Sequence, residues 1–140
     1  MSHICGQLSL GRVLENIMSG RILIIEDSLD NMTIATLILE SMGYTVFQAQ
    51  TGYDGFKVAL EQKPDVVIMD YHLPGINGLE ATRMIKASQS ISNIPVIALT
   101  ADIYAKQPLL EAGCSAYLAK PIRKGSLLRT INQVLSAELV

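Results

Sequence analysis

The stretch Asp65-Val-Val-Ile-Met-Asp70 ends a run of apolar residues with a carboxylate. Because no polar residue interrupts 66–69, the run predicts a strand that is buried on both faces of a parallel sheet. The following stretch, Tyr71-His-Leu-Pro-Gly-Ile-Asn-Gly78, is rich in the residues that turns favour. The sequence therefore places Asp70 at the carboxyl end of a buried strand, next to a loop.

Three further apolar runs also end in residues that can carry chemistry. Residues 21–25 lead into Glu26-Asp27, residues 95–99 into Thr100, and residues 115–119 into Lys120-Pro121. If these strands are parallel neighbours, three carboxylates, a hydroxyl and an ammonium group converge on one edge of the sheet. Carboxylates suit a hard divalent cation, and the hydroxyl and ammonium suit phosphoryl oxygens. The set fits a phosphorylated aspartate beside a metal ion.

Short β-rich runs alternate with helix-like stretches from residue 21 onward. Five such βα units predict an α/β fold, a parallel sheet with helices on both faces. Right-handed crossovers favour the flavodoxin-like (βα)5 order 2-1-3-4-5, and ligands bind where that order reverses, beside Glu26, Asp27 and Asp70. We expect strands near 21–25, 44–48, 65–69, 95–99 and 115–119, and helices near 29–42, 54–62, 77–88, 105–112 and 123–137.

The composition excludes several classes of protein. With 140 residues, 49% apolar and 17% charged, the chain is expected to fold as one globular domain. A net charge of −2 without a Lys/Arg cluster argues against nucleic-acid binding, and the apolar runs are too short to span a membrane. Cys5 and Cys114 lack metal-ligand spacing, and the sequence shows no secretory leader. We expect a cytoplasmic protein in which Cys114 is a small core residue.

Residues 1–20 stand outside the alternating pattern. They contain apolar residues at helical spacing, followed by Ser19-Gly20, which is typical of a hinge. We expect this extension to be either disordered or a short amphipathic helix, and we expect the domain itself over residues 21–140. The apolar residues are Leu10, Val13, Leu14, Ile17 and Met18.

Four segments together resemble the receiver domain of two-component response regulators, in particular the stand-alone chemotaxis type. The resemblance covers about residues 21–137 and implies the flavodoxin-like fold. The segments are Ile-Leu-Ile-Ile-Glu-Asp (22–27), Val-Ile-Met-Asp-Tyr-His-Leu-Pro-Gly-Ile-Asn-Gly (67–78), Ile-Ala-Leu-Thr-Ala (97–101) and Tyr-Leu-Ala-Lys-Pro (117–121).

The resemblance assigns an acceptor and a metal site. Asp70 matches the phosphoacceptor, which takes a phosphoryl group from a histidine of a sensor kinase or of a histidine phosphotransfer protein. Asp27, Asp70 and the main-chain carbonyl of His72 match the Mg²⁺ ligands, and Glu26 assists directly or through water. The side chain of His72 is expected to point outward.

The resemblance also assigns a switch. Thr100 and Lys120 match the groups that bind the phosphoryl oxygens, and Tyr117 matches an aromatic residue that moves inward when Thr100 moves. The bond between Lys120 and Pro121 matches a cis peptide position. Phosphorylation is then expected to change the surface formed by the fourth helix, the fifth strand and the fifth helix, and so to control a downstream protein.

Such a protein is a phosphoacceptor that assists its own phosphorylation and dephosphorylation, rather than an enzyme acting on another substrate. It is expected to be a monomer or a weak, phosphorylation-dependent dimer. A phosphorelay shuttle or sink, and a receiver fragment of a longer regulator or hybrid kinase, stay open as alternatives. An aspartyl-phosphate hydrolase is disfavoured, because His72 stands where that class has a second carboxylate. A receiver that never uses phosphate would be expected to lack Asp70, Thr100 or Lys120.

Residues 100–113 depart from the family pattern. This stretch is shorter than is usual, and it carries Pro108, which is tolerated only in the first turn of a helix. We therefore expect a short helix that begins near Lys106 or Gln107, after a remodelled loop at 102–105. The departure concerns the usual output surface rather than the acceptor chemistry.

Overall fold

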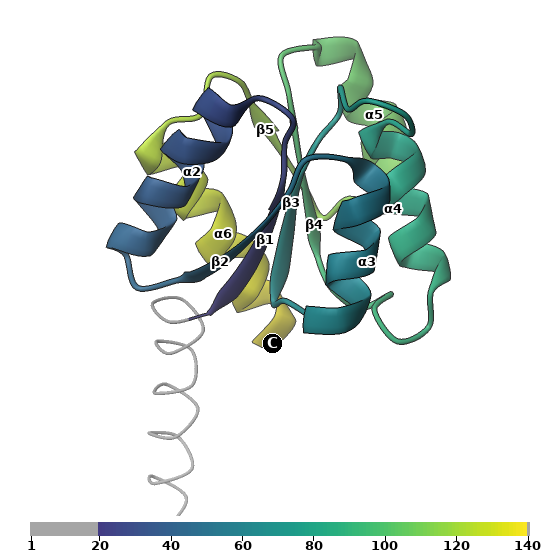
Figure 1. The fold of residues 1–140 in the computed structure, drawn as a ribbon, viewed down its shortest axis with the longest axis horizontal. Coiled ribbons are helices and arrows are strands. Elements are labelled where there is room, and N and C mark those ends of the chain that lie inside the picture. The colour runs from purple at the N-terminus through teal and green to yellow at the C-terminus, as the bar shows by residue number, and fades with distance from the viewer. Residues whose placement is uncertain (1–19, 140) are drawn as a thin grey trace, which may run out of the picture.

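The computed structural model describes residues 20–139, which form a five-stranded parallel sheet flanked by helices (Figure 1). The strand order is β2-β1-β3-β4-β5, so the predicted order 2-1-3-4-5 is confirmed. The strands are β1 (Arg21–Ile25), β2 (Thr45–Ala49), β3 (Val66–Asp70), β4 (Val96–Thr100) and β5 (Ala116–Ala119).

Helices cover both faces of the sheet, as predicted. In Figure 1, α2 and α6 lie on one side of the sheet, and α3, α4 and α5 lie on the other. The helices are α2 (Leu29–Ser41), α3 (Gly52–Gln62), α4 (Gly78–Ala87), α5 (Lys106–Glu111) and α6 (Lys124–Leu139), with a 3₁₀ turn η1 (Ile103–Ala105) before α5.

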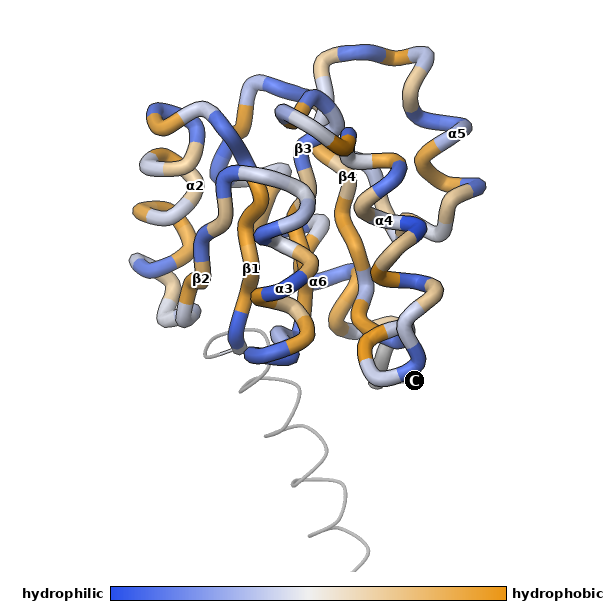
Figure 2. The backbone as a smooth tube through the Cα atoms, turned by 45° about the vertical axis from the view of Figure 1, so that its right-hand side comes forward, coloured by the Kyte–Doolittle hydropathy of each residue, from blue (hydrophilic) through white to orange (hydrophobic). Residues whose placement is uncertain are grey.

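The central strands are buried on both faces. Successive residues of β1 point to opposite sides, so Ile22 and Ile24 join the core under α2 and α6, and Leu23 and Ile25 join the core under α3 and α4. All five residues of β3 are buried. Figure 2 shows the same strands as the hydrophobic centre of the molecule. The uninterrupted apolar runs therefore reflect burial on both sides of the sheet.

Side-chain caps fix where the helices begin after the strands. Ser28 accepts a hydrogen bond from the Asn31 amide at the start of α2, and Thr51 accepts one from the Asp54 amide at the start of α3. Asn77 starts α4 with a capping box. Because each cap satisfies an amide that the helix leaves unpaired, the loops at the carboxyl edge of the sheet are held in defined positions.

The segment after β4 contains the expected short helix, but residues 103–105 of the expected loop form the 3₁₀ turn η1. Asp102 caps η1 by accepting from the Tyr104 amide at 2.9 Å, and α5 begins at Lys106. Pro108 is the third residue of α5, where its missing N–H removes no hydrogen bond within the helix. The peptide bond between Lys120 and Pro121 is cis, which confirms that expectation.

Two further expectations concern the N-terminal extension and membrane-spanning segments. The predicted N-terminal extension falls almost entirely on residues 1–19, which lie outside the described residues. Among residues 20–139, no helix combines the length and the apolar character that a membrane crossing requires.

Candidate functional site

Three carboxylates meet at the carboxyl edge of the sheet. Glu26 and Asp27 directly follow β1, and Asp70 is the last residue of its neighbour β3. One oxygen from each lies within 4.8 Å of the others. Glu26 and Asp70 are each only 1% exposed, whereas Asp27 is exposed. The predicted acidic cluster is therefore formed, with one member open to solvent.

Lys120 joins this cluster from the end of β5. Its Nζ donates to Asp70 Oδ2 at 3.0 Å and lies 3.3 Å from Glu26 Oε1. Burial by itself would lower the pKa of Lys120, but its hydrogen bond with Asp70 and the charges of Asp70 and Glu26 outweigh this effect and raise it. Lys120 thus stays protonated and partly neutralises the carboxylates.

Glu26 is the member of the cluster whose buried charge is least well compensated. Desolvation by burial, together with the neighbouring Asp70, raises the pKa of Glu26 to about 6 despite the opposing effects of Asn31 and Lys120. Both of its carboxylate oxygens are buried, and neither has a hydrogen-bond partner. A buried carboxylate normally has hydrogen bonds or a bound cation. The ion pair with Lys120 satisfies it only in part.

These carboxylates fit a divalent metal ion. Mg²⁺ prefers oxygen ligands, keeps several waters and is typically held by one or two carboxylates and a phosphate group. Glu26, Asp27 and Asp70 offer such oxygens close together, and the exposed position of Asp27 leaves the cluster open to solvent. The unpaired oxygens of Glu26 are the feature that a cation, or water bound to it, would satisfy.

Thr100 lies at the end of β4, one residue beyond the partner of Asp70 in the strand register. It is fully buried, and its Oγ1 accepts from the Asp102 amide at 3.0 Å. The Tyr117 hydroxyl donates to the carbonyl oxygen of Thr100 at 3.5 Å, and the Lys120 amide donates to the same carbonyl at 3.1 Å. The predicted switch residues, Thr100 and Tyr117, are therefore in direct contact.

His72 contributes its backbone rather than its ring. The amide of His72 donates to Asp70 Oδ1 at 3.3 Å, while the side chain is exposed and its ring packs edge-on against Tyr71. The outward side chain agrees with the expectation. Metal coordination by the main-chain carbonyl stays a prediction.

Three contributions to the site had no recognised sequence signal. Gly78 packs so closely that a Cβ there would collide with the carbonyl oxygen of Asp70, although the sequence shows Gly78 only as one of several turn residues. The Asp102 amide holds the Thr100 hydroxyl. Lys106 lies over the Tyr117 ring, with its Nζ 5.8 Å from the ring centroid. The close approach of Gly78 to Asp70 and the contact of Lys106 with Tyr117 depend on how different elements pack, whereas the Asp102 contact is local.

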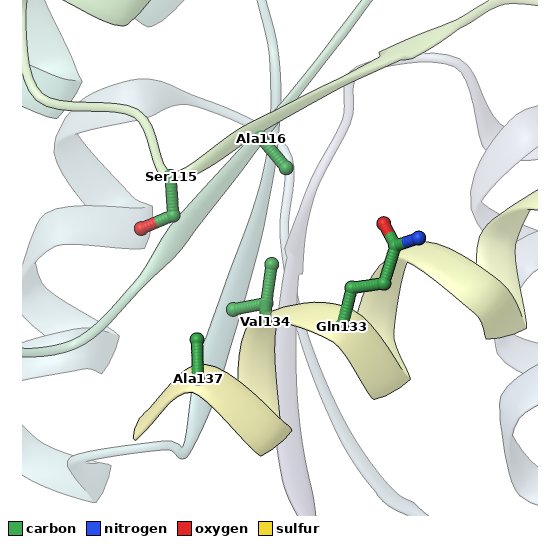
Figure 3. A pocket seen from close by; sticks show the side chains of 5 residues that line it. All are labelled: Ser115, Ala116, Gln133, Val134 and Ala137. Atoms are coloured by element: carbon green, nitrogen blue, oxygen red, sulfur yellow. The ribbon is translucent and has the colours of Figure 1, made fainter. Parts of the chain in front are cut away.

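A cavity of about 170 Å³ lies away from this cluster (Figure 3). Ser115 and Ala116 line it at the start of β5, and Gln133, Val134 and Ala137 line it from α6. Because the strands are parallel, the start of β5 is at the opposite edge of the sheet from the acidic cluster. The cavity is therefore not part of the candidate site.

The comparison with protein families decides the identity of this domain. The model of the response regulator receiver domain matches residues 22–132. The chain belongs to the response regulator receiver family. Its fold and its acidic cluster are thus those of a receiver in two-component signalling.

Two relatives resemble this receiver over nearly their whole length. Protein PilH of Pseudomonas aeruginosa is 42% identical over 118 residues, which cover 83% of this chain and 98% of PilH. The polar-differentiation response regulator DivK of Brucella ovis is 33% identical over 120 residues, covering 84% of this chain and 98% of DivK.

Solved structures of response-regulator receivers have the same fold as this chain. The receiver domain of the sensor histidine kinase PA1611 from Pseudomonas aeruginosa PAO1 has a TM-score of 0.79 and 34% identity, covering 84% of this chain and 98% of that chain. That structure has a magnesium ion coordinated in its active-site cleft. The chemotaxis response regulator CheY4 of Vibrio cholerae also has a TM-score of 0.79, at 25% identity, covering 83% of this chain and 98% of that chain.

Proposed function

We propose that this receiver accepts a phosphoryl group on Asp70, with Mg²⁺ held by Glu26, Asp27, Asp70 and the carbonyl of His72. The observation that carries the proposal is the acidic cluster with Lys120 across it, bonded to Asp70 at 3.0 Å and lying 3.3 Å from Glu26. The phosphodonor is a histidine of a sensor kinase or of a phosphotransfer protein. The metal ion, when bound, would neutralise charge on the phosphoryl oxygens.

Transfer exchanges one bond to phosphorus for another. A carboxylate oxygen of Asp70 attacks the phosphorus, the bond between phosphorus and the donor imidazole nitrogen breaks, and its electron pair stays with the imidazole. Lys120 supplies a fixed positive charge beside the attacking carboxylate. The burial of Asp70 and Glu26 strengthens these electrostatic interactions. The protein promotes its own modification and does not turn over a separate substrate.

The switch follows from where the new charge is placed. A phosphoryl group adds negative charge and acceptor oxygens next to Lys120, and the Thr100 hydroxyl can donate to one of them. Moving that hydroxyl breaks its hydrogen bond with the Asp102 amide and so releases the start of η1. Tyr117, bonded to the Thr100 carbonyl, is displaced together with it. The surface of α5, β5 and α6 then changes and binds a downstream protein.

A phosphorelay shuttle or sink is the second candidate. It uses the same acceptor chemistry but passes the phosphoryl group to another histidine instead of presenting a changed surface. The short α5 favours this candidate. This helix is part of the usual output surface of the family, and here it is only six residues long.

Intact-mass analysis after incubation with acetyl phosphate and Mg²⁺ tests the proposal. We expect one phosphoryl adduct on the wild type, none without Mg²⁺ and none on Asp70→Asn. Asp65→Asn is the matched control, because Asp65 directly precedes β3, whose last residue is Asp70, and is exposed. Adduct formation on Asp70→Asn would refute the acceptor assignment.

A further inference from the structure

Thr100 is hydrogen-bonded to two different segments of the chain. Its hydroxyl accepts from the Asp102 amide at 3.0 Å, and its carbonyl oxygen accepts from the Tyr117 hydroxyl at 3.5 Å. The first bond leads into η1, where the Ala105 amide donates to the Asp102 carbonyl at 3.1 Å. Lys106 follows directly as the first residue of α5, and Figure 1 shows this segment at the carboxyl end of the sheet. The contacts of the Thr100 hydroxyl therefore lead through η1 to Lys106.

Lys106 closes this path by contacting Tyr117. Its Nζ lies 5.8 Å from the centroid of the Tyr117 ring, within the distance at which a cation is attracted to an aromatic face. Among the side chains that the structure describes, no carboxylate lies within ion-pair distance of the Lys106 ammonium. The contact joins α5 to β5 and leads back to the Thr100 carbonyl through the Tyr117 hydroxyl. Thr100, η1, Lys106 and Tyr117 thus form a closed network of contacts.

The stability of α5 does not explain why a lysine occupies this position. A positive charge in the first turn of a helix is unfavourable, because the N-terminal end of the helix carries partial positive charge itself. The Lys106 side chain is exposed, whereas Tyr117 is partly buried. The interaction that the ammonium makes is the one with the Tyr117 ring. A role for Lys106 therefore concerns Tyr117 rather than the helix.

We propose that Lys106 is a positioning residue that holds Tyr117 in the unphosphorylated arrangement and so opposes the switch. This inference rests on the proposed function, in which the Thr100 hydroxyl leaves the Asp102 amide and Tyr117 is displaced together with Thr100. Because that displacement takes the ring away from Lys106, the contact is made in one state only and favours that state. A cation–π contact of this kind shifts the equilibrium between the two states about two- to fivefold.

Binding of beryllofluoride in the presence of Mg²⁺, measured by titration calorimetry, tests the proposal. Lys106→Met removes the charge and keeps a side chain of similar length. We expect this variant to bind beryllofluoride about two- to fivefold more tightly than the wild type, because more of the protein is in the binding-competent state. The loss of a positive charge would by itself weaken the binding of an anion, so the two effects have opposite signs. Lys106→Arg should restore the wild-type affinity, since a guanidinium group also stacks on aromatic faces.

Lys57→Met is the matched control. The Nζ of Lys57 lies 5.4 Å from the centroid of the Tyr53 ring, so this variant removes the same charge and the same kind of contact, but on α3. Its affinity for beryllofluoride should equal that of the wild type. In a Tyr117→Leu background, Lys106→Met should change nothing, because the ring on which Lys106 acts is absent.

Four results would overturn the inference. Unchanged or weaker binding by Lys106→Met would overturn it and leave the proposed function in place. A gain that persists in the Tyr117→Leu background would show that Lys106 acts without the ring. An equal gain in Lys57→Met would show an effect of charge alone. Wild-type protein that does not bind beryllofluoride would refute the proposed function, and this inference with it.

Discussion

Glu26 and Lys120 have opposite effects on the carboxylate cluster. Glu26 adds a negative charge that is 1% exposed and lacks hydrogen bonds, so its ionised form is costly. Lys120 offsets that charge through contacts with both Glu26 and Asp70. The free energy of unfolding of the metal-free protein should therefore depend on both residues, with opposite signs.

Replacing Glu26 with Gln should change how stability depends on pH. The pKa of Glu26 is about 6 in the folded protein, above its ordinary value of 4.5, so the folded state holds this proton more tightly. The contribution of Glu26 to stability is therefore fully present below pH 4.5 and is lost as the pH rises to about 6. In EDTA, Glu26→Gln should gain on the order of 2 kcal/mol relative to the wild type between pH 4.5 and 7. Urea unfolding measures the difference, and a pH-independent difference would contradict this account.

Replacing Lys120 with Ala should destabilise the metal-free protein and preserve metal binding. The variant leaves Glu26 and Asp70 buried without their cationic partner, and we expect a loss of about 1–3 kcal/mol, since Lys120 itself is partly exposed. Mg²⁺ should recover part of that loss. Urea unfolding in EDTA and in Mg²⁺ measures both effects, with the exposed Lys124→Ala as the control. Loss of Mg²⁺ affinity in Lys120→Ala would count against its role opposite the metal.

At the scale of elements, the start of α4 holds the acceptor strand in position. The Gly78 amide donates to the Tyr71 carbonyl at 2.8 Å, and the capping box of Asn77 and Glu80 fixes the first turn. Gly78 itself contacts the backbone of Asp70 and Tyr71, so this helix begins directly against the end of β3.

Replacing Gly78 with Ala should therefore be costly. The added Cβ would meet backbone atoms of Asp70 and Tyr71, which cannot move as a flexible side chain would. We expect a loss of about 1–3 kcal/mol, measured by urea unfolding. Gly125→Ala, in the first turn of α6, is the control, since its Cβ would meet only the end of the Arg129 side chain. It should be neutral or slightly stabilising, because Ala favours helices. Equal effects of the two changes would refute this account.

The strands and the cluster could be predicted from the sequence because they depend on local patterns. Apolar runs such as 66–69 indicate burial, and the chain order of the residues that follow them predicts which groups meet in a parallel sheet. The contact of Lys106 with Tyr117 and the collision that Gly78 avoids could not be predicted. They depend on how α5 and α4 pack on the sheet to within a few tenths of an ångström, which no periodicity encodes.

At the scale of the whole molecule, the site joins strands that are far apart in the chain. Groups at the carboxyl ends of β1, β3, β4 and β5 lie at one edge, so a ligand bound there links most of the sheet. In the proposed switch, the path from Thr100 to the surface of α5 includes the Asp102 amide and the Tyr117 hydroxyl.

Beryllofluoride, which mimics a phosphoryl group, should bind together with Mg²⁺ and raise the thermal unfolding temperature of the protein. A ligand that binds only the folded state stabilises it. Amides of residues 100–107 and 116–120 should change their hydrogen exchange, because the Thr100 hydroxyl and Tyr117 connect them to the site. Asp70→Asn should show neither effect. Stabilisation without a change in these two segments would argue for the shuttle or sink.

The most direct test of the central claim is to locate the phosphoryl group within the chain. The protein is treated with acetyl phosphate and Mg²⁺, the acyl phosphate is reduced with borohydride, and the digested peptides are sequenced by mass spectrometry. We predict reduction at Asp70 alone, in a Mg²⁺-dependent manner. A label on Glu26, Asp27 or a histidine, or a label at Asp70 that does not require Mg²⁺, would contradict the account.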